Sequence, residues 1–211
     1  MPIITILEIL DIIIMSALIG FIFSNYFSRY NVFKKPKDYV NIYHFGKKFN
    51  WSDLLFSTSL FAPGIILHEL GHKFIALALG YSATFFSSIS LNKLVHGLPF
   101  LDFPAILMII ALISAYFGSP FLFFVPGYVA FSAMTPPPQQ TLIAFAGPGV
   151  NLILWLGCKY LAKSKRIHHK YLPFVAITGK INMILFIFNM IPLPGFDGEK
   201  VFRGLFSLLL A

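Results

Sequence analysis

The chain has few of the residues that cross-link or charge most soluble proteins. Its single cysteine, Cys158, can form neither an intrachain disulfide nor a cysteine-based zinc site. Only 11% of the 211 residues are charged, roughly half the share in a soluble domain, and 57% are hydrophobic. A net charge of +8 would indicate nucleic-acid binding only if the charge were carried by a soluble basic domain. We expect neither such a domain nor a nucleic-acid partner. The composition predicts an integral membrane protein.

Long apolar runs support this class of protein. Five are long enough, or nearly so, to cross a hydrocarbon core about 30 Å thick: residues 3–27, 54–80, 103–117, 141–161 and 172–191. A further apolar stretch, residues 201–211, is too short to span. Within the first run, Glu8 and Asp11 lie one turn apart, and they face either the bundle interior or, as we expect, the membrane interface.

Two segments have the character of strands. The stretch "YSATFFSSISL", residues 81–91, alternates and is rich in β-branched, aromatic and serine residues, and "SPFLFFVPGYVAFSAMTPPPQQ", residues 119–140, is similar but broken by Pro and Gly. Strands in lipid cannot leave their backbone unpaired, so we expect these segments to pair at the membrane edge.

Positive charge is concentrated beside the apolar runs. Eleven of the sixteen Lys and Arg residues lie in residues 29–48 and 159–170. The positive-inside rule places both segments on one side, so the chain between them crosses an even number of times. Residues 103–133 would then enter the membrane and return, or cross it twice.

The stretch "GIILHELGHKFIALALG", residues 64–80, carries His68, Glu69 and His72 into an apolar run. On a helix the two imidazoles project from one face, one turn apart, and both can reach one Zn²⁺ at about 2.0–2.1 Å. Glu69 could then take a proton from the reacting water. The alternative is a hydrogen-bonded polar cluster within the bundle, which is costly in lipid without a metal.

A catalytic zinc site usually has three protein ligands, and this chain has few acids to supply the third. Asp197 follows a helix broken by Pro192 and Pro194, where a carboxylate can face inward. Glu199 is the competing candidate, and Asp197 could also be an ordinary Asp-Gly turn residue. Beside two unmatched histidines, we favour Asp197 as the ligand.

Three motifs together resemble those of the site-2 protease family of intramembrane zinc metalloproteases: HELGH at 68–72, AGPGVN at 146–151 and FNMIPLPGFDG at 188–198. The resemblance implies that His68, His72 and Asp197 bind zinc and that Glu69 is the general base. It also implies that Asn151 lies near the active site and positions substrate or stabilises the oxyanion. Asn182 and Asn189 match recurrent asparagines of the family's last core helix.

We therefore predict an intramembrane zinc endopeptidase with one Zn²⁺ per chain and a membrane-protein substrate. The alternative is a non-catalytic membrane protein that binds zinc or helices. The expected fold is an all-α polytopic membrane protein with about five to six membrane helices, a small membrane-edge β element and a three-helix catalytic core. We divide it into an N-terminal helix and basic link (1–50), the catalytic core (51–200) and a short C-terminal apolar segment (201–211).

The expected location is the plasma membrane, as a multi-pass protein in the lipid bilayer. The resemblance puts the active site nearer the cytosolic face. The positive-inside rule gives the opposite orientation, because it places both basic segments in the cytosol. The sequence makes no prediction about oligomeric state.

Overall fold

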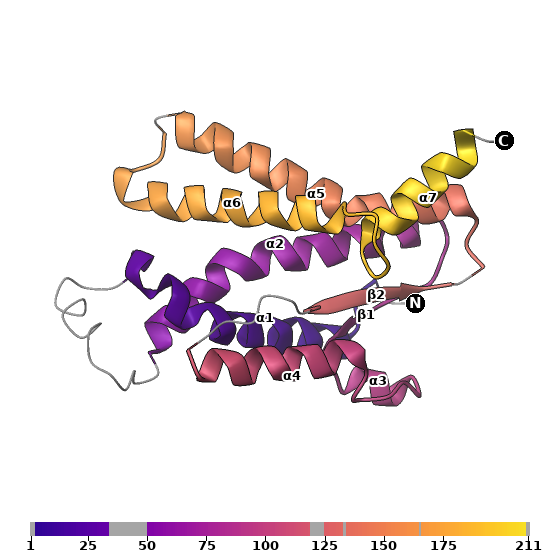
Figure 1. Cartoon of the computed structure of the whole chain (residues 1–211), viewed down its shortest axis with the longest axis horizontal. Coiled ribbons are helices and arrows are strands. Elements are labelled where there is room, and N and C mark those ends of the chain that lie inside the picture. The colour runs from indigo at the N-terminus through magenta and orange to yellow at the C-terminus, as the bar shows by residue number, and fades with distance from the viewer. Residues whose placement is uncertain (1–2, 34–49, 119–124, 133, 165, 210–211) are drawn as a thin grey trace.

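Four long apolar helices dominate the computed structural model, which describes residues 3–33, 50–118, 125–132, 134–164 and 166–209 (Figure 1). They are α1 (Ile6–Phe27), α2 (Trp51–Ala78), α5 (Pro137–Lys163) and α6 (Leu172–Asn189). With the 3₁₀ turns η1 (Ser28–Tyr30) and η3 (His169–Tyr171) that adjoin α1 and α6, each is long and apolar enough to cross a membrane. The prediction of a helical membrane protein is confirmed.

The apolar core lies where α1, α2, the sheet and α4 (Phe103–Tyr116) meet. Met15, Ile19, Phe56, Leu60 and Met108 are fully buried there. Many large side chains outside this core are exposed, among them Ile13, Ile110, Ile153 and Ile187. An apolar exterior around an apolar core is expected of a protein that faces lipid.

Helix α4 differs from the long helices in length. Its 14 residues extend about 21 Å at 1.5 Å per residue, less than the roughly 30 Å of a hydrocarbon core. It is therefore not among the helices long enough to span, although residues 103–117 are apolar throughout.

The two strands form one small antiparallel sheet. Strand β1 (Ala83–Ser87) pairs with β2 (Gly127–Phe131), from Ala83 opposite Phe131 to Ser87 opposite Gly127. The strand character predicted for both segments is confirmed, over five residues in each. Between the strands lie α4 and the short α3 (Asn92–Val95).

Glu8 and Asp11 lie in the bundle interior, each 1% exposed, so the expectation that they sit at the interface was wrong. Glu8 Oε1 accepts the Phe85 N–H at 2.8 Å and pairs with Lys73. Asp11 Oδ2 accepts the Ser87 N–H at 3.3 Å and the Ser90 hydroxyl at 2.6 Å. The reason is the outer edge of β1, whose backbone N–H groups need acceptors that lipid cannot provide.

Helix α2 is capped at its start and contains an internal proline. Its N-cap is Asn50, whose side chain accepts the Ser52 N–H at 2.8 Å. The helix also passes through Pro63 without restarting. Neighbouring helices commonly compensate for a proline within a membrane helix, and α2 contacts α1, α5 and α6.

The two ends of the molecule differ in what they carry. The end of α1 with η1, the start of α2, the end of α5 and the start of α6 with η3 lie at one end in Figure 1. Arg29 belongs to η1, Lys163 to α5 and Lys170 to η3. The sheet, the C-terminal part of α2 and the last helix, α7 (Asp197–Leu209), lie at the other. Helix α4 runs toward the first end and β2 runs in the opposite direction (Figure 1). That residues 103–133 enter the membrane and return, or cross it twice, stays a prediction, and residues 119–124 and 133 lie outside the described residues.

Candidate metal centre

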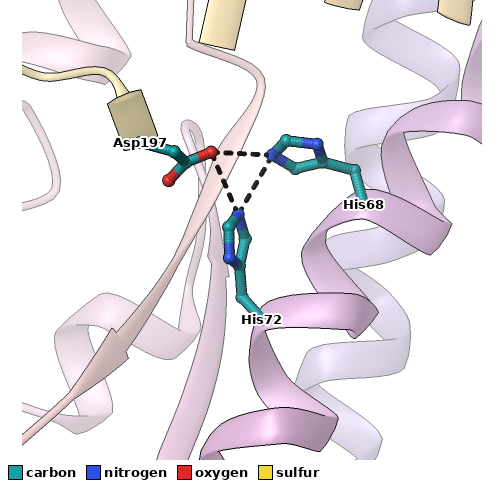
Figure 2. Close-up of side chains that lie close together, drawn as sticks. All are labelled: His68, His72 and Asp197. Atoms are coloured by element: carbon teal, nitrogen blue, oxygen red, sulfur yellow. Dashed lines mark hydrogen bonds and ion pairs between the residues drawn. The ribbon is translucent and has the colours of Figure 1, made fainter. Parts of the chain in front are cut away.

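Three potential ligand atoms meet between α2 and α7 (Figure 2). His68 Nε2 and His72 Nε2 lie 3.1 Å apart, and Asp197 Oδ2 lies 3.3 Å from the first and 3.2 Å from the second. Ligands about 2.0–2.1 Å from a tetrahedral Zn²⁺ are separated by about 3.3 Å. The triangle therefore matches one face of a zinc tetrahedron, with the fourth position left for water or substrate.

The secondary structure explains how distant residues reach this point. His68 and His72 are four residues apart on α2 and so project from one face. Asp197 opens α7, directly after a turn in which Gly195 has φ +94°, a conformation that favours glycine. Gly198 allows this first turn to approach the end of α6, because a Cβ there would lie 2.5 Å from the Met190 carbonyl group.

The outer nitrogen of each imidazole is hydrogen-bonded to an acceptor. His68 Nδ1–H donates to Asn151 Oδ1 at 2.6 Å, and His72 Nδ1–H donates to the Ile143 carbonyl at 2.7 Å. Each ring therefore carries a proton on Nδ1 and directs Nε2 to the centre of the site, where a neutral ring offers a lone pair to a metal and a protonated ring donates to Asp197. The neutral ring is the form that a metal at the centre requires.

Asn151 is fully buried and bonded on all sides. Its Nδ2 donates to the Gly64 carbonyl at 3.1 Å and to Asn182 Oδ1 at 2.9 Å, which leaves its Oδ1 for His68. Asn182 in turn donates to the Thr178 carbonyl at 2.9 Å. Among the described residues, the Asn189 side chain bonds only within its own helix, to the Leu185 carbonyl at 3.0 Å.

Gly147 provides the space that the imidazoles occupy. A Cβ at this position would lie 2.7 Å from His68 Nε2 and would also collide with the His72 ring. Gly149, two residues on, has only the Phe145 ring near it, at 3.4 Å or more. The small residues of "AGPGVN" thus admit the histidines at Gly147, whereas a Cβ at Gly149 would meet only the Phe145 ring of the same helix.

Glu69 and Glu199 have different surroundings. Glu69 is 8% exposed, and its carboxyl lies close enough to His68, His72 and Asp197 to interact electrostatically with all three. The Glu69 carboxyl forms no side-chain hydrogen bond with the described residues. Glu199 is half-buried and pairs with Arg203 at 3.5 Å, so of the two candidate third ligands only Asp197 reaches the histidines.

The charge on Asp197 suits a metal ligand. Burial alone would raise the pKa of this carboxyl, but the hydrogen bonds with His68 and His72 outweigh burial and hold the pKa well below its usual range. The group is therefore a carboxylate at neutral pH. Two imidazoles and one carboxylate are the donor set of many catalytic zinc sites.

Two hydrogen-bonding groups of the site could not be predicted from the sequence motifs. The Ile143 carbonyl carries no signal, since every residue has one. Asn182 could be noted only because it matches a recurrent asparagine of the family, and nothing in the sequence pairs it with Asn151.

Several curated proteins are similar to this chain. "Putative zinc metalloprotease MJ0611" of Methanocaldococcus jannaschii is 33% identical over 158 residues, which make up 73% of each chain. "Putative zinc metalloprotease sll0528" of Synechocystis is 26% identical over 155 residues, 74% of this chain and 32% of that protein. "Putative zinc metalloprotease Rip2" of Mycolicibacterium smegmatis is 29% identical over 140 residues, 64% of this chain and 51% of that protein.

No family model and no solved structure matches the chain. The similarity to the Methanocaldococcus protein nevertheless extends over most of both sequences, and the described residues include His68, His72 and Asp197, a group that could hold a metal ion. The chain belongs to the zinc metalloprotease family of these relatives.

Proposed function

We propose that the chain is an intramembrane endopeptidase that hydrolyses peptide bonds in or near the membrane-spanning segments of other proteins. The observation that carries this proposal is the position of the His68–His72–Asp197 triangle. Two of its corners lie on α2, which is long and apolar enough to span a membrane, and their hydrogen-bond acceptors lie on α5, another such helix. A soluble metalloprotease has no reason to place its metal ligands there.

One Zn²⁺ per chain would be held by His68, His72 and Asp197. When bound, zinc lowers the pKa of water and polarises a peptide carbonyl. Glu69 then accepts a proton from the attacking water and delivers it to the departing amine. The absence of a hydrogen bond to Glu69 from the described residues leaves its carboxylate free for this transfer.

Asn151 supports the reaction through His68. The family resemblance assigns this asparagine to substrate or oxyanion, but both of its amide donor bonds go to Gly64 and Asn182. No donor remains for an oxyanion while this network holds. We therefore assign Asn151 as a positioning residue that orients the His68 ring and fixes its tautomer.

The substrate must present an extended peptide, because the carbonyls of an intact helix are hydrogen-bonded and shielded. The sheet can hold such a peptide by strand addition. Strand β2 contacts α2, and the Lys200 ammonium of α7 lies 5.4 Å from the centre of the Phe131 ring. The strand thus adjoins both elements that supply the metal ligands.

We place the protein in the plasma membrane with this site nearer the cytosolic face, as the family resemblance implies. The sheet, the C-terminal part of α2 and α7 would then face the cytosol. The basic α5–α6 connection would lie on the other side.

Replacing Glu69 tests the proposal. In Glu69→Gln, we expect unchanged zinc content and a loss of cleavage of about 10²–10⁴-fold, the usual size of general acid–base catalysis. Glu199→Gln is the matched control, because Glu199 is a half-buried acid two residues from Asp197 whose carboxylate pairs with Arg203 and not with the ligands. Cleavage would be measured with purified protein on a mixture of synthetic single-span peptides in the same micelles, with products identified by mass spectrometry.

The same assay separates the alternative function. Chelation should abolish cleavage by the native protein and added Zn²⁺ should restore it. Zinc binding without any cleavage by the native protein would instead favour a non-catalytic zinc-binding or helix-binding protein. Equal cleavage by the native protein and Glu69→Gln would refute the assigned mechanism.

A further inference from the structure

A groove of about 240 Å³ lies between α5 and α6, away from the metal centre. Apart from Lys159, Lys163 and Lys180, its lining is mainly apolar and includes Trp155 and Val175. Both helices are long enough to span a membrane, so an open groove between them faces acyl chains. A cationic rim on an apolar groove is an unusual surface for this environment.

Within the described residues, no carboxylate forms an ion pair with the lysines of this groove. The sequence has no Asp or Glu anywhere in residues 103–196. Lys180 lies eight residues into α6, about 12 Å from its start, and Lys159 lies about 6 Å from the end of α5. Ammonium groups at this depth need an anionic partner or must extend to water.

We infer that the groove binds an anionic phospholipid. One acyl chain would lie along the apolar lining, and the phosphate would lie among Lys159, Lys163 and Lys180. Basic pockets between membrane helices are suited to acidic headgroups, and each lysine contributes about 1 kcal/mol of attraction at an anionic surface. The basic connection that follows α5 strengthens the local positive potential but does not line the groove.

A lipid fits better than a free phosphate because of the rest of the lining. Gly179 has no side chain and lies against Cys158, where a Cβ would be 2.9 Å from the Cys158 Cβ. The floor of the groove is thus small and uncharged, and apart from the three lysines the lining has no charged group to bind an anion. An acyl chain buries this floor, whereas inorganic phosphate leaves it exposed to lipid.

The two tryptophans of the chain allow a direct test, since Trp155 lines the groove and Trp51 does not. In Trp51→Phe, Trp155 is the only tryptophan, and its fluorescence reports brominated acyl chains that bind beside it. The full-length protein would be reconstituted in phosphatidylcholine bilayers with equal fractions of brominated phosphatidylglycerol or brominated phosphatidylcholine. We expect the anionic lipid to be preferred at Trp155 by about fivefold or more.

Matched variants separate a groove site from general surface charge. Lys159→Gln with Lys180→Gln should abolish the preference, whereas Arg166→Gln with Lys170→Gln, which removes two charges outside the groove, should retain it. Replacing Lys159 and Lys180 with Arg keeps the charge and should also retain it. Zinc content and Trp155 emission in pure phosphatidylcholine would verify folding.

Three results would overturn the inference. They are equal quenching by the two lipids, an equal loss of preference in both glutamine pairs, and loss of the preference in the arginine pair. Displacement of the anionic lipid by millimolar inorganic phosphate would show a site for free phosphate instead. None of these results depends on cleavage. The lipid-binding inference is therefore tested independently of the proposed protease activity.

Discussion

Each imidazole of the site has one nitrogen directed at the metal position and one bonded to an acceptor on α5. The acceptor for His68 is a side chain, Asn151, and the acceptor for His72 is the Ile143 backbone. Only the first can be removed by substitution. Of the two hydrogen-bond acceptors behind the imidazoles, only Asn151 can therefore be tested by mutation.

Asn151→Leu should weaken zinc binding by about 10–100-fold, the usual effect of losing an outer-shell partner. Asn189→Leu is the matched control, because Asn189 bonds only to its own helix. Asn151→Asp keeps an acceptor for His68 Nδ1–H but loses the donor to the Gly64 carbonyl and Asn182 Oδ1, so it should restore binding only in part. The zinc affinity of all three variants is measured by competition with a chromophoric chelator. Unchanged affinity in Asn151→Leu would show that Asn151 does not support zinc binding.

Gly147 and Gly149 offer a second comparison at the residue scale. A methyl group at Gly147 would lie 2.7 Å from His68 Nε2, far inside normal contact, while one at Gly149 would meet only the Phe145 ring at 3.4 Å. Gly147→Ala should therefore lower zinc affinity by about tenfold or more, and Gly149→Ala should leave it nearly unchanged. The zinc affinity of both variants is measured by the same chelator competition. Equal zinc affinities would contradict the close packing of Gly147 against the two imidazoles.

At this scale the sequence was informative because the polar residues are so few. Two histidines at helical spacing in an apolar run need a third ligand, and Asp197 was one of a handful of acids available. The Ile143 carbonyl and the contact between Gly147 and the rings could not be foreseen. Both depend on how closely α5 approaches α2, which no local pattern encodes.

At the scale of elements, α1 determines which edge of the sheet is free. Glu8 and Asp11 accept the Phe85 and Ser87 N–H groups, so these point away from β2. Thr84 and Phe86 then face β2, opposite Ala130 and Tyr128. Gly127, Val129 and Phe131 are left with their backbone groups on the outer edge of β2.

This outer edge is where we expect a substrate strand to pair. Val129→Pro removes one N–H from it and should lower cleavage by about tenfold, the effect of losing roughly one hydrogen bond. Val129→Thr keeps the backbone N–H and should cleave normally. Zinc content should stay constant in both. Equal cleavage of the peptide mixture by the two variants would exclude strand addition at this residue.

The element scale also shows why the acids of α1 were misplaced from sequence. A carboxylate in an apolar run can lie at the interface at low cost, and that choice is the safer one without a known partner. The partners are backbone N–H groups of β1 and the ammonium of Lys73, more than sixty residues further along the chain. The sequence predicted where the strand lies in the chain, but not that one edge of β1 would face the carboxylates of α1.

At the scale of the whole molecule, the path of residues 103–133 determines the topology. Helix α4 is too short to span, and β2 returns toward the end from which α4 starts (Figure 1). Pro99 and Pro138, which flank this path, are both exposed and should lie on one side of the membrane. Lys170, in the connection between α5 and α6, should lie on the other.

Single cysteines at Pro99, Pro138 and Lys170, each in a Cys158→Ala background, would test this arrangement with a membrane-impermeant thiol reagent. In sealed vesicles we expect Pro99→Cys and Pro138→Cys to be labelled together and Lys170→Cys only in vesicles of the opposite orientation. Labelling of the first two from opposite faces would refute the even number of crossings. Because the orientation of the vesicles is known, the same data decide between the two orientations. Cytosolic labelling at Pro99 and Pro138 supports the orientation of the family, and cytosolic labelling at Lys170 supports the positive-inside rule.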